Sequence, residues 1–245
     1  MQLSIDLNSD LGEGFAYDAE IMSLISSCNI ACGGHVGNVA SMKNAMQLAQ
    51  QNKVKIGAHP SYKDPINFGR KSLPISSLQL YTDLAFQLEN FLEVAEGQKA
   101  VVNHLKPHGA LYNDLFFDKA KAEVLIELLY DFNFSGELYV APNSEIEQLA
   151  LAEGFPVTTE AFADRNYQYD LQLVSRDSPD AVLTNPTSIA KRLVQMILTQ
   201  QVVSITGEKI DFNFQTVCLH SDTPNAIQIA KEIHQTLQKN QIHIE

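Results

Sequence analysis

Short apolar runs alternate with longer stretches of helical periodicity along nearly the whole chain. The runs predict strands at 3–8, 28–32, 54–59, 101–106, 137–142, 155–160, 181–184 and 216–220. Between them, apolar residues recur at helical spacing over 18–27, 39–52, 75–95, 118–133, 143–153, 187–201 and 223–239. Strand–helix pairs in series are typical of a parallel sheet. Seven or eight parallel strands of this kind favour an α/β fold closed into a TIM-like (β/α) barrel.

The length and composition agree with one barrel domain. A (β/α) barrel takes about 250 residues, and this chain has 245, so we expect a single domain over 1–245. Hydrophobic residues make up 45% of the chain, which is enough for a sizeable core.

Charge and cysteine content narrow the class of protein. The net charge of −12 argues against a nucleic acid or an anionic membrane as partner. No apolar run approaches the roughly 18 residues of a membrane helix, and the first residues, MQLSIDLN, lack a signal-peptide pattern. The three cysteines show no disulfide pattern, which is typical of the cytoplasm. We therefore expect a cytoplasmic protein with a small-molecule substrate.

Polar residues gather where the predicted strands end. In a (β/α) barrel the active site lies at the carboxyl ends of the strands, and six of the eight predicted strands end in polar or ionisable residues. In chain order these are Asp6, Asn8, Asp10, Glu13, Asn29, His35, His59, Lys106, His108, Glu160, Asp164, Arg165, His220 and Asp222. We expect these side chains to meet at one mouth of the barrel.

The first strand shows the pattern most clearly. Successive side chains of a strand point to opposite faces, so Asp6, Asn8 and Asp10 share one face, and the apolar Leu3, Ile5 and Leu7 share the other. A buried carboxylate is costly unless it is paired, hydrogen-bonded or bound to a metal. We expect the polar face to line the barrel interior and its mouth. The alternative is that Asp6 and Asn8 satisfy the backbone groups of loops.

The segment NHLKPHGALYN, residues 103–113, places His104, Lys106 and His108 on one side of the fourth strand. Pro107 and Gly109 then end the strand and shape the turn. Carboxylates around Lys106 would hold it charged, although desolvation opposes this. The alternative is a structural ion pair between Lys106 and Asp6 or Asp10. His104 lies deeper and is expected to be structural.

Several common motifs are absent from the sequence. No G-x-x-x-x-G-K-[ST] phosphate loop occurs. The D-x-N-x-D spacing at 6–10 is not a calcium loop, because Leu11 and Tyr17 stand where glycine and an acid are needed. ACGGHVGN, residues 31–38, lacks the second ligand pair of a zinc site.

Seven longer motifs together resemble one known family. DLNSDLGEGF, CNIACGGHVGN, GAHPSY, FGRK, LKPHGALYN, EAFADRNY and LHSD are similar, in order from residue 6 to residue 222, to the LamB/YcsF family. Asn38 stands where the family usually has Asp, and Ser221 where Gly is usual. The resemblance implies a TIM-like barrel related in shape to the metal-dependent polysaccharide deacetylases.

The resemblance also implies an activity. It is the ATP-dependent opening of 5-oxo-L-proline (pyroglutamate) to L-glutamate, with ADP and phosphate as the other products, carried out with two other 5-oxoprolinase subunits. A lactam is a resonance-stabilised amide, and ATP can activate its carbonyl oxygen as a phosphate ester. Since no phosphate loop is present, the nucleotide is expected to bind by another mode or on a partner subunit.

Site roles follow from this expectation. The substrate carboxylate would suit Arg70, Lys106 or Arg165 through charge-assisted hydrogen bonds. Asp10, His59 or His108 could handle the proton or the water. The expected catalytic residues are Asp10, His59, Lys106 and His108. The expected substrate-binding residues are Asp6, Asn8, Glu13, Asn29, His35, Arg70, Glu160, Asp164, Arg165 and His220.

Two other classes of protein remain open. One is a metal-dependent amide hydrolase or deacetylase acting on a carbohydrate or small amide, in which Asp10, His35 and His59 hold a divalent cation that activates water. The other is a non-catalytic regulatory or scaffold subunit. The density of polar strand ends argues against a scaffold, which has no need of a charged interior.

Overall fold

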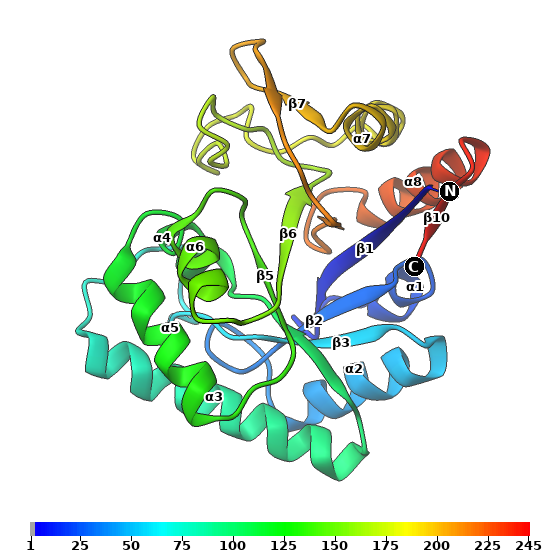
Figure 1. The fold of residues 1–245 in the computed structure, drawn as a ribbon. Helices are drawn as coiled ribbons and strands as arrows, with labels where there is room; N and C mark the ends of the chain where they lie inside the picture. Colours follow the sequence, from blue (N-terminus) through cyan, green and yellow to red (C-terminus); the bar gives the residue numbers. More distant parts are fainter. Residues whose placement is uncertain (1–2) are drawn as a thin grey trace.

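Seven parallel strands close into a barrel in the computed structural model, which describes residues 3–245 (Figure 1). They are β1 (Leu3–Leu11), β2 (Ser27–Ala31), β3 (Lys55–His59), β4 (Val102–Leu105), β5 (Glu137–Val140), β6 (Val157–Phe162) and β9 (Thr216–Cys218). The barrel closes because β9 pairs in parallel with both β6 and β1. A short strand, β10 (Ile242–Ile244), pairs in parallel with the start of β1. The fold is therefore the TIM-like barrel that the sequence predicts.

Helices alternate with these strands and lie outside the barrel (Figure 1). They are α1 (Asp18–Met22), α2 (Val39–Asn52), α3 (Ser77–Gln98), α4 (Gly109–Asp114), α5 (Lys119–Asp131), α6 (Glu145–Ala152), α7 (Pro186–Thr199) and α8 (Ala226–Lys239). Asn38 caps α2, because its side chain accepts hydrogen bonds from the backbone of Ala40 and Ser41. Asn38 can therefore cap the helix as an Asp at this position could. No helix within residues 3–245 has both the length and the apolar character needed to span a membrane.

Strand β1 divides its side chains between the two faces as its alternation predicts. Ile5, Leu7 and Leu11 belong to the hydrophobic core, while Asp6 and Asp10 are buried among polar groups. The apolar side packs on the helices and the polar side lines the barrel interior. The fold therefore places a column of polar groups along the barrel axis, and the site is built from this column.

The predicted strand at 181–184 is wrong. In this segment Val182 makes an isolated antiparallel bridge with Arg165 and joins no sheet. A run of three apolar residues can also pack as a loop, and here the backbone oxygen of Ala181 accepts a hydrogen bond from the Arg165 side chain. The segment belongs to a long connection from β6 to β9 that also contains α7 and an antiparallel hairpin of β7 (Gln201–Val203) and β8 (Lys209–Asp211).

Candidate active site

A cavity of about 550 Å³ opens at the carboxyl ends of the strands. Its lining includes ten of the residues predicted from the sequence, namely Asp10, Glu13, His59, Arg70, Lys106, His108, Glu160, Arg165, His220 and Asp222. One wall comes from residues 171–177, in the connection between β6 and β9. The cavity thus lies at the end of the barrel where active sites of this fold are found.

Lys106, which follows β4, is a buried cation at the base of this cavity. Its Nζ lies 2.8 Å from Glu160 Oε1 and 3.0 Å from Asp10 Oδ1. It also donates to Asn8 Oδ1 at 3.3 Å. Burial disfavours the charged amine, but the carboxylates of Asp10 and Glu160 outweigh it and raise the pKa of Lys106 well above its usual value. The cation is therefore fixed in position and stays charged.

Asp10, near the end of β1, has its two carboxylate oxygens in different environments. Oδ1 accepts hydrogen bonds from Asn29 at 2.8 Å and Lys106 at 3.0 Å. Oδ2 lies 3.4 Å from Nε2 of His59. Burial alone would raise the pKa of Asp10, but nearby positive charge, including that of Lys106, holds it well below its usual value. Asp10 is thus an ionised carboxylate with one oxygen directed toward the histidines.

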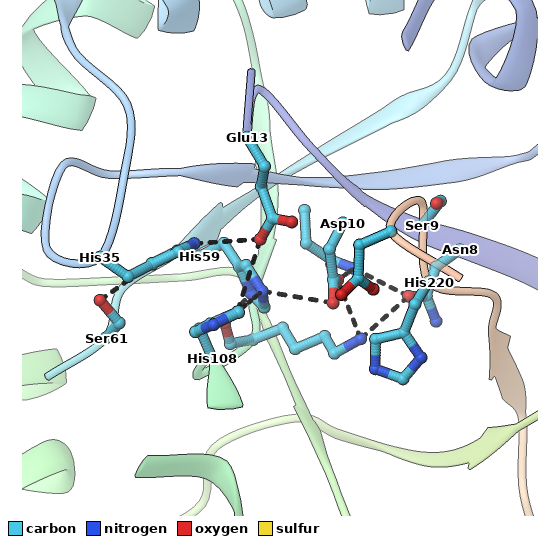
Figure 2. A network of polar contacts seen from close by, with 12 residues as sticks. Asn8, Ser9, Asp10, Glu13, His35, His59, Ser61, His108 and His220 are labelled. Carbon is cyan, nitrogen blue, oxygen red and sulfur yellow. Dashed lines mark hydrogen bonds and ion pairs between the residues drawn. The ribbon is translucent and has the colours of Figure 1, made fainter. Parts of the chain in front are cut away.

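Three histidines lie side by side next to Asp10 (Figure 2). Nδ1 of His59 contacts the backbone oxygen of Lys106 at 2.7 Å, and Nε2 of His108 contacts the backbone oxygen of Phe68 at 3.0 Å. The remaining nitrogens, His59 Nε2 and His108 Nδ1, lie 3.0 Å apart. The ring of His35 stacks on that of His108 with 3.7 Å between centroids.

Glu13 and His35 form a pair behind this cluster. Oε1 of Glu13 lies 3.0 Å from Nε2 of His35 and 3.5 Å from Nδ1 of His108. Burial and the charge of Asp10 raise the pKa of Glu13 well above its usual value, and burial lowers the pKa of His35 to about 3. Ser61 donates to the backbone oxygen of Tyr62 and so accepts from Nδ1–H of His35. One proton therefore lies between Oε1 of Glu13 and Nε2 of His35.

A second carboxylate–histidine pair forms the opposite wall. Nδ1 of His220, after β9, lies 3.0 Å from Oδ1 of Asp164, and Thr223 also donates to Asp164. Burial opposes ionisation of Asp164, but His220 lowers the pKa of this carboxyl below its usual value. The His220 ring stacks on Phe162 at 5.2 Å. Asp164 does not line the cavity itself, so its effect on a ligand passes through His220.

Asp6 does not reach the mouth, contrary to the expectation for the polar face of β1. It lies level with Thr216, the first residue of β9, and accepts hydrogen bonds from the hydroxyls of Ser26, Ser27 and Thr216. It therefore lies near the amino ends of the neighbouring strands, opposite the cavity. Hydroxyl groups satisfy Asp6, rather than the loop backbone that the sequence left open as an alternative.

Asn8, Asn29 and His104 form a buried layer between Asp6 and the cavity. Asn8 donates to Glu160 at 2.9 Å, and Asn29 donates to both Asn8 and Asp10. Nε2 of His104 contacts Asn29 Oδ1 at 2.7 Å, and a Cβ at Gly57 would lie 2.1 Å from this nitrogen. The glycine on β3 thus makes room for the ring. Asn8 and Asn29 do not line the cavity, so they support Asp10, Lys106 and Glu160 from beneath.

At the rim, the predicted arginines have protein partners. Arg70 pairs with Asp222, and Arg176 lies 3.7 Å from the same carboxylate. Arg165 donates to the backbone oxygens of Ala181 and Val174 and so holds the wall formed by residues 171–177. Arg70 and Arg176 therefore lie together at the edge of the cavity, whereas the Arg165 side chain is taken up by backbone oxygens.

Among the polar residues of the cavity wall that sequence reasoning missed is Tyr112. It lies on α4, a helix that the periodicity did not reveal, and its ring packs edge-to-face on Phe162 at 5.5 Å. Burial and the nearby Glu160 raise the pKa of Tyr112 well above its usual value, yet its hydroxyl has no hydrogen-bond partner among residues 3–245. Oε2 of Glu160 is likewise buried without a hydrogen-bond partner in that range. These two groups can bind a polar ligand in the cavity.

The family profile of LamB/YcsF proteins matches residues 5–245. This chain belongs to the LamB/YcsF family. Two similar LamB/YcsF relatives, each named as the A subunit of 5-oxoprolinase, come from Haemophilus influenzae strains PittEE and 86-028NP. Each is 39% identical over 240 residues, which is 98% of this chain and 98% of the relative.

Solved structures agree with this assignment. The lactam utilization protein from Thermus thermophilus is 31% identical, with a TM-score of 0.92 and coverage of 99% of both chains. The family 4 carbohydrate esterase from Streptomyces lividans has a TM-score of 0.51 at 10% identity, covering 98% of this chain and 91% of that one. The second likeness concerns the fold alone.

The groups of possible metal ligands differ from the set expected from the sequence. Among the described residues, Asp10 and His59 come together with His108, with their ligand atoms within 4.8 Å of one another. His35 groups instead with Glu13 and His108. His35 contacts Glu13 and Ser61, so the structure groups it with Glu13 and His108 rather than with Asp10 and His59, and the expected set of Asp10, His35 and His59 stays a prediction.

Proposed function

We propose that this LamB/YcsF protein is the A subunit of a 5-oxoprolinase, and that its cavity is where the ring amide of 5-oxo-L-proline opens to give L-glutamate. The relatives named for that subunit and the similar lactam utilization protein support this proposal. The observation that carries it is the buried Lys106 cation, fixed within 3.0 Å of Asp10 and Glu160 at the base of the cavity. A fixed positive charge stabilises the negative charge that develops on an amide oxygen under attack.

The reaction requires an activated ring. A lactam carbonyl is resonance-stabilised, and a five-membered ring favours closure, so hydrolysis needs coupling. In the proposed reaction 5-oxo-L-proline, ATP and two waters give L-glutamate, ADP and phosphate. Transfer of phosphate to the carbonyl oxygen makes that oxygen a leaving group. Because the sequence has no phosphate loop, we place ATP binding partly or wholly on partner subunits.

The residues of the cavity take separate roles in this proposal. The cluster of Asp10, His59 and His108 holds the attacking water and accepts its proton. The C–N bond of the ring then breaks, and His220 on the opposite wall, oriented by Asp164, gives a proton to the nitrogen that becomes the amino group. This leaves a γ-glutamyl phosphate, and the second water displaces phosphate from it to give the side-chain carboxylate of glutamate. Lys106 stabilises the charge on the oxygen of the attacked carbon.

Substrate recognition uses the remaining polar groups of the cavity. 5-Oxoproline carries a carboxylate, which Arg70 and Arg176 at the rim can bind by charge-assisted hydrogen bonds. The hydroxyl of Tyr112 and the unpaired oxygen of Glu160 lie deeper and can bind the ring amide. A substrate bound in this way would satisfy both buried groups.

The test is glutamate release from 5-oxoproline by the purified chain, with and without ATP and two partner subunits. We expect turnover when all three subunits and ATP are present, and little turnover by this chain alone. Lys106→Ala should abolish most of the turnover of the complex, whereas Lys43→Ala, at an exposed position on α2, should not. Full turnover by the isolated chain would sink the partner requirement, and no glutamate from the complex would sink the function.

A second candidate is a metal-dependent amide hydrolase or deacetylase, favoured by the grouping of Asp10, His59 and His108. It predicts release of acetate from acetylated sugars or of a product from small amides without ATP, dependent on a divalent cation. A non-catalytic scaffold is disfavoured, because burying Asp10, Glu160 and Lys106 together has no purpose in a subunit that only binds other chains.

A further inference from the structure

We infer that Asp10 Oδ2, His59 Nε2 and His108 Nδ1 form a binding site for one divalent first-row transition-metal ion, open on its remaining side to the cavity. The three atoms come from the ends of β1, β3 and β4 and lie within 4.8 Å of one another (Figure 2). The inference does not depend on which amide the subunit hydrolyses, because binding of the ion can be measured without a substrate.

A backbone oxygen fixes which ring nitrogen of His59 carries the proton. Its Nδ1 lies 2.7 Å from the backbone oxygen of Lys106, and a backbone oxygen can only accept a hydrogen bond. Nδ1 therefore carries the proton, and in the neutral ring Nε2 has a lone pair. This lone pair faces Oδ2 of Asp10 at 3.4 Å, an atom that is itself an acceptor.

His108 is fixed in the same way by a second backbone oxygen. Its Nε2 lies 3.0 Å from the oxygen of Phe68, so Nε2 carries the proton and Nδ1 has the lone pair. That lone pair lies 3.0 Å from Nε2 of His59. Two ring lone pairs and a carboxylate oxygen thus face one another, which is repulsive unless a cation or an extra proton lies among them. Metal-ligating histidines usually donate their other N–H to a carbonyl or carboxylate, as both rings do here.

The spacing suits a metal ion. Bonds of about 2.0–2.2 Å to one ion hold neighbouring ligand atoms roughly 3.0–3.6 Å apart, depending on octahedral or tetrahedral geometry. The observed separations are 3.0 Å between the two ring nitrogens and 3.4 Å between His59 and Asp10. Two imidazoles and one carboxylate favour Zn²⁺, Co²⁺, Fe²⁺, Mn²⁺ or Ni²⁺ over Mg²⁺ or Ca²⁺.

The surroundings of Asp10 agree with this role. Its other oxygen, Oδ1, is held by Asn29 and Lys106, so Oδ2 is left directed at the histidines. Hydrogen bonds of this kind orient a ligating carboxylate. An ion at this position would supply a bound water with a lowered pKa, facing the cavity.

The neighbouring group of Glu13, His35 and His108 is a weaker candidate. Ser61 fixes the Nδ1 proton of His35, so its Nε2 lone pair also faces an acceptor oxygen, that of Glu13. In this pair a single proton on Glu13 resolves the contact at 3.0 Å. The contact between His59 and His108 joins two ring nitrogens, and each neutral ring already carries its proton on the other nitrogen. A proton between them would therefore make one of the rings an imidazolium.

The experiment titrates the chelator-treated full chain with Co²⁺ and with Zn²⁺. We expect one ion per chain by calorimetry, visible absorption bands from bound Co²⁺, and a rise in thermal midpoint with Zn²⁺. His59→Gln, His108→Gln and Asp10→Asn should each weaken binding by at least about ten-fold, the lower range for loss of even an outer-shell partner. Circular dichroism of the metal-free variants checks that each one folds.

Two matched histidine variants complete the experiment. His35→Gln tests the neighbouring group, and His234→Gln, on α8 away from the cavity, tests adventitious binding by histidine. Both should bind Co²⁺ with the affinity of the unmodified chain. Equal loss in His35→Gln and His59→Gln would move the site to Glu13 and overturn the proposal. If the unmodified chain binds Co²⁺ and Zn²⁺ no more tightly than His59→Gln does, only a proton lies between the two rings. That result would also overturn the proposal.

Discussion

Lys106 and Glu160 meet across the barrel, with 2.8 Å between Nζ and Oε1, although one follows β4 and the other lies on β6. The pair is buried, with side-chain exposures of 2% and 0%. Burial raises the pKa of Glu160, and Lys106 opposes this rise. The contact couples two strands of the barrel at the base of the cavity, so both activity and stability should depend on it.

Lys106→Met should reduce turnover of the assembled complex by about 10²–10³-fold, because a fixed charge at the attacked carbonyl is lost. It should also lower the free energy of unfolding by about 3–5 kcal/mol, since buried carboxylates lose their counter-ion. The double variant Lys106→Met/Glu160→Gln should recover part of that stability and none of the turnover. Thermal midpoints and steady-state rates on the same preparations check both. Near-native rates per folded molecule would make Lys106 a purely structural residue.

Tyr112→Phe should leave the protein as stable or slightly more stable, because a buried hydroxyl without a hydrogen-bond partner is removed. If that hydroxyl binds the substrate, KM should rise by up to about ten-fold, the value of one hydrogen bond. Tyr62→Phe is the matched control, since its hydroxyl donates to Asp114 at 2.6 Å outside the cavity. It should lower the thermal midpoint and leave KM unchanged. A fall in midpoint with no change in KM for Tyr112→Phe would remove it from the binding site.

Asp164→Asn should reduce turnover by about 10²–10⁴-fold if His220 transfers a proton, because the charge that orients and stabilises the ring is lost. Thr223→Val removes another hydrogen bond to Asp164 but leaves the His220 contact, so its effect should be much smaller. Single-turnover rates of the two variants, compared at equal folded fractions, make the distinction. Equal rates for Asp164→Asn and the unmodified chain would assign His220 a role in shape alone.

His104 should make stability depend on pH. Burial lowers its pKa from 6.5 to about 3, so the folded protein favours the neutral ring. The stabilisation is complete above about pH 6.5 and is lost as pH falls toward 3, with a slope of up to about 1.4 kcal/mol per pH unit. His104→Gln should therefore lose stability less steeply over this range. Urea unfolding at several pH values measures the two slopes, and parallel curves would contradict the assignment.

The sequence predicts the barrel well because the alternation of apolar runs and helical periodicity repeats along nearly the whole chain. It misplaces Asp6 because alternation along β1 defines the face of a residue but not its depth in the barrel. The same alternation puts Asp10 on the correct face, and its place near the carboxyl end of β1 brings it to the cavity. The run 181–184 resembles a strand because three consecutive apolar residues occur both in strands and in packed loops.

Residues from loops and short helices are the hardest to place. The sequence predicts His35 beside Asp10 and His59, but the chain after β2 carries it to Glu13 and Ser61. Hydrophobic periodicity does not predict the path of a loop, so it cannot place the side chains that the loop carries. Tyr112 lies on α4, which has six residues and is too short for a recognisable pattern. Its position within LKPHGALYN, beside Lys106 and His108, is the available signal.

The closure of the barrel through β1 and β9 has a consequence for how the chain folds. The carboxylate of Asp6 accepts a hydrogen bond from Thr216, which lies 210 residues later. On a ribosome, β1 can pair with β2 early, but its other edge waits until almost the whole chain has been made. Contacts between such distant residues form slowly, since a long loop must close first. Strand β1 is therefore among the last strands of the barrel to be completed, because the edge that β9 covers stays unpaired until that moment.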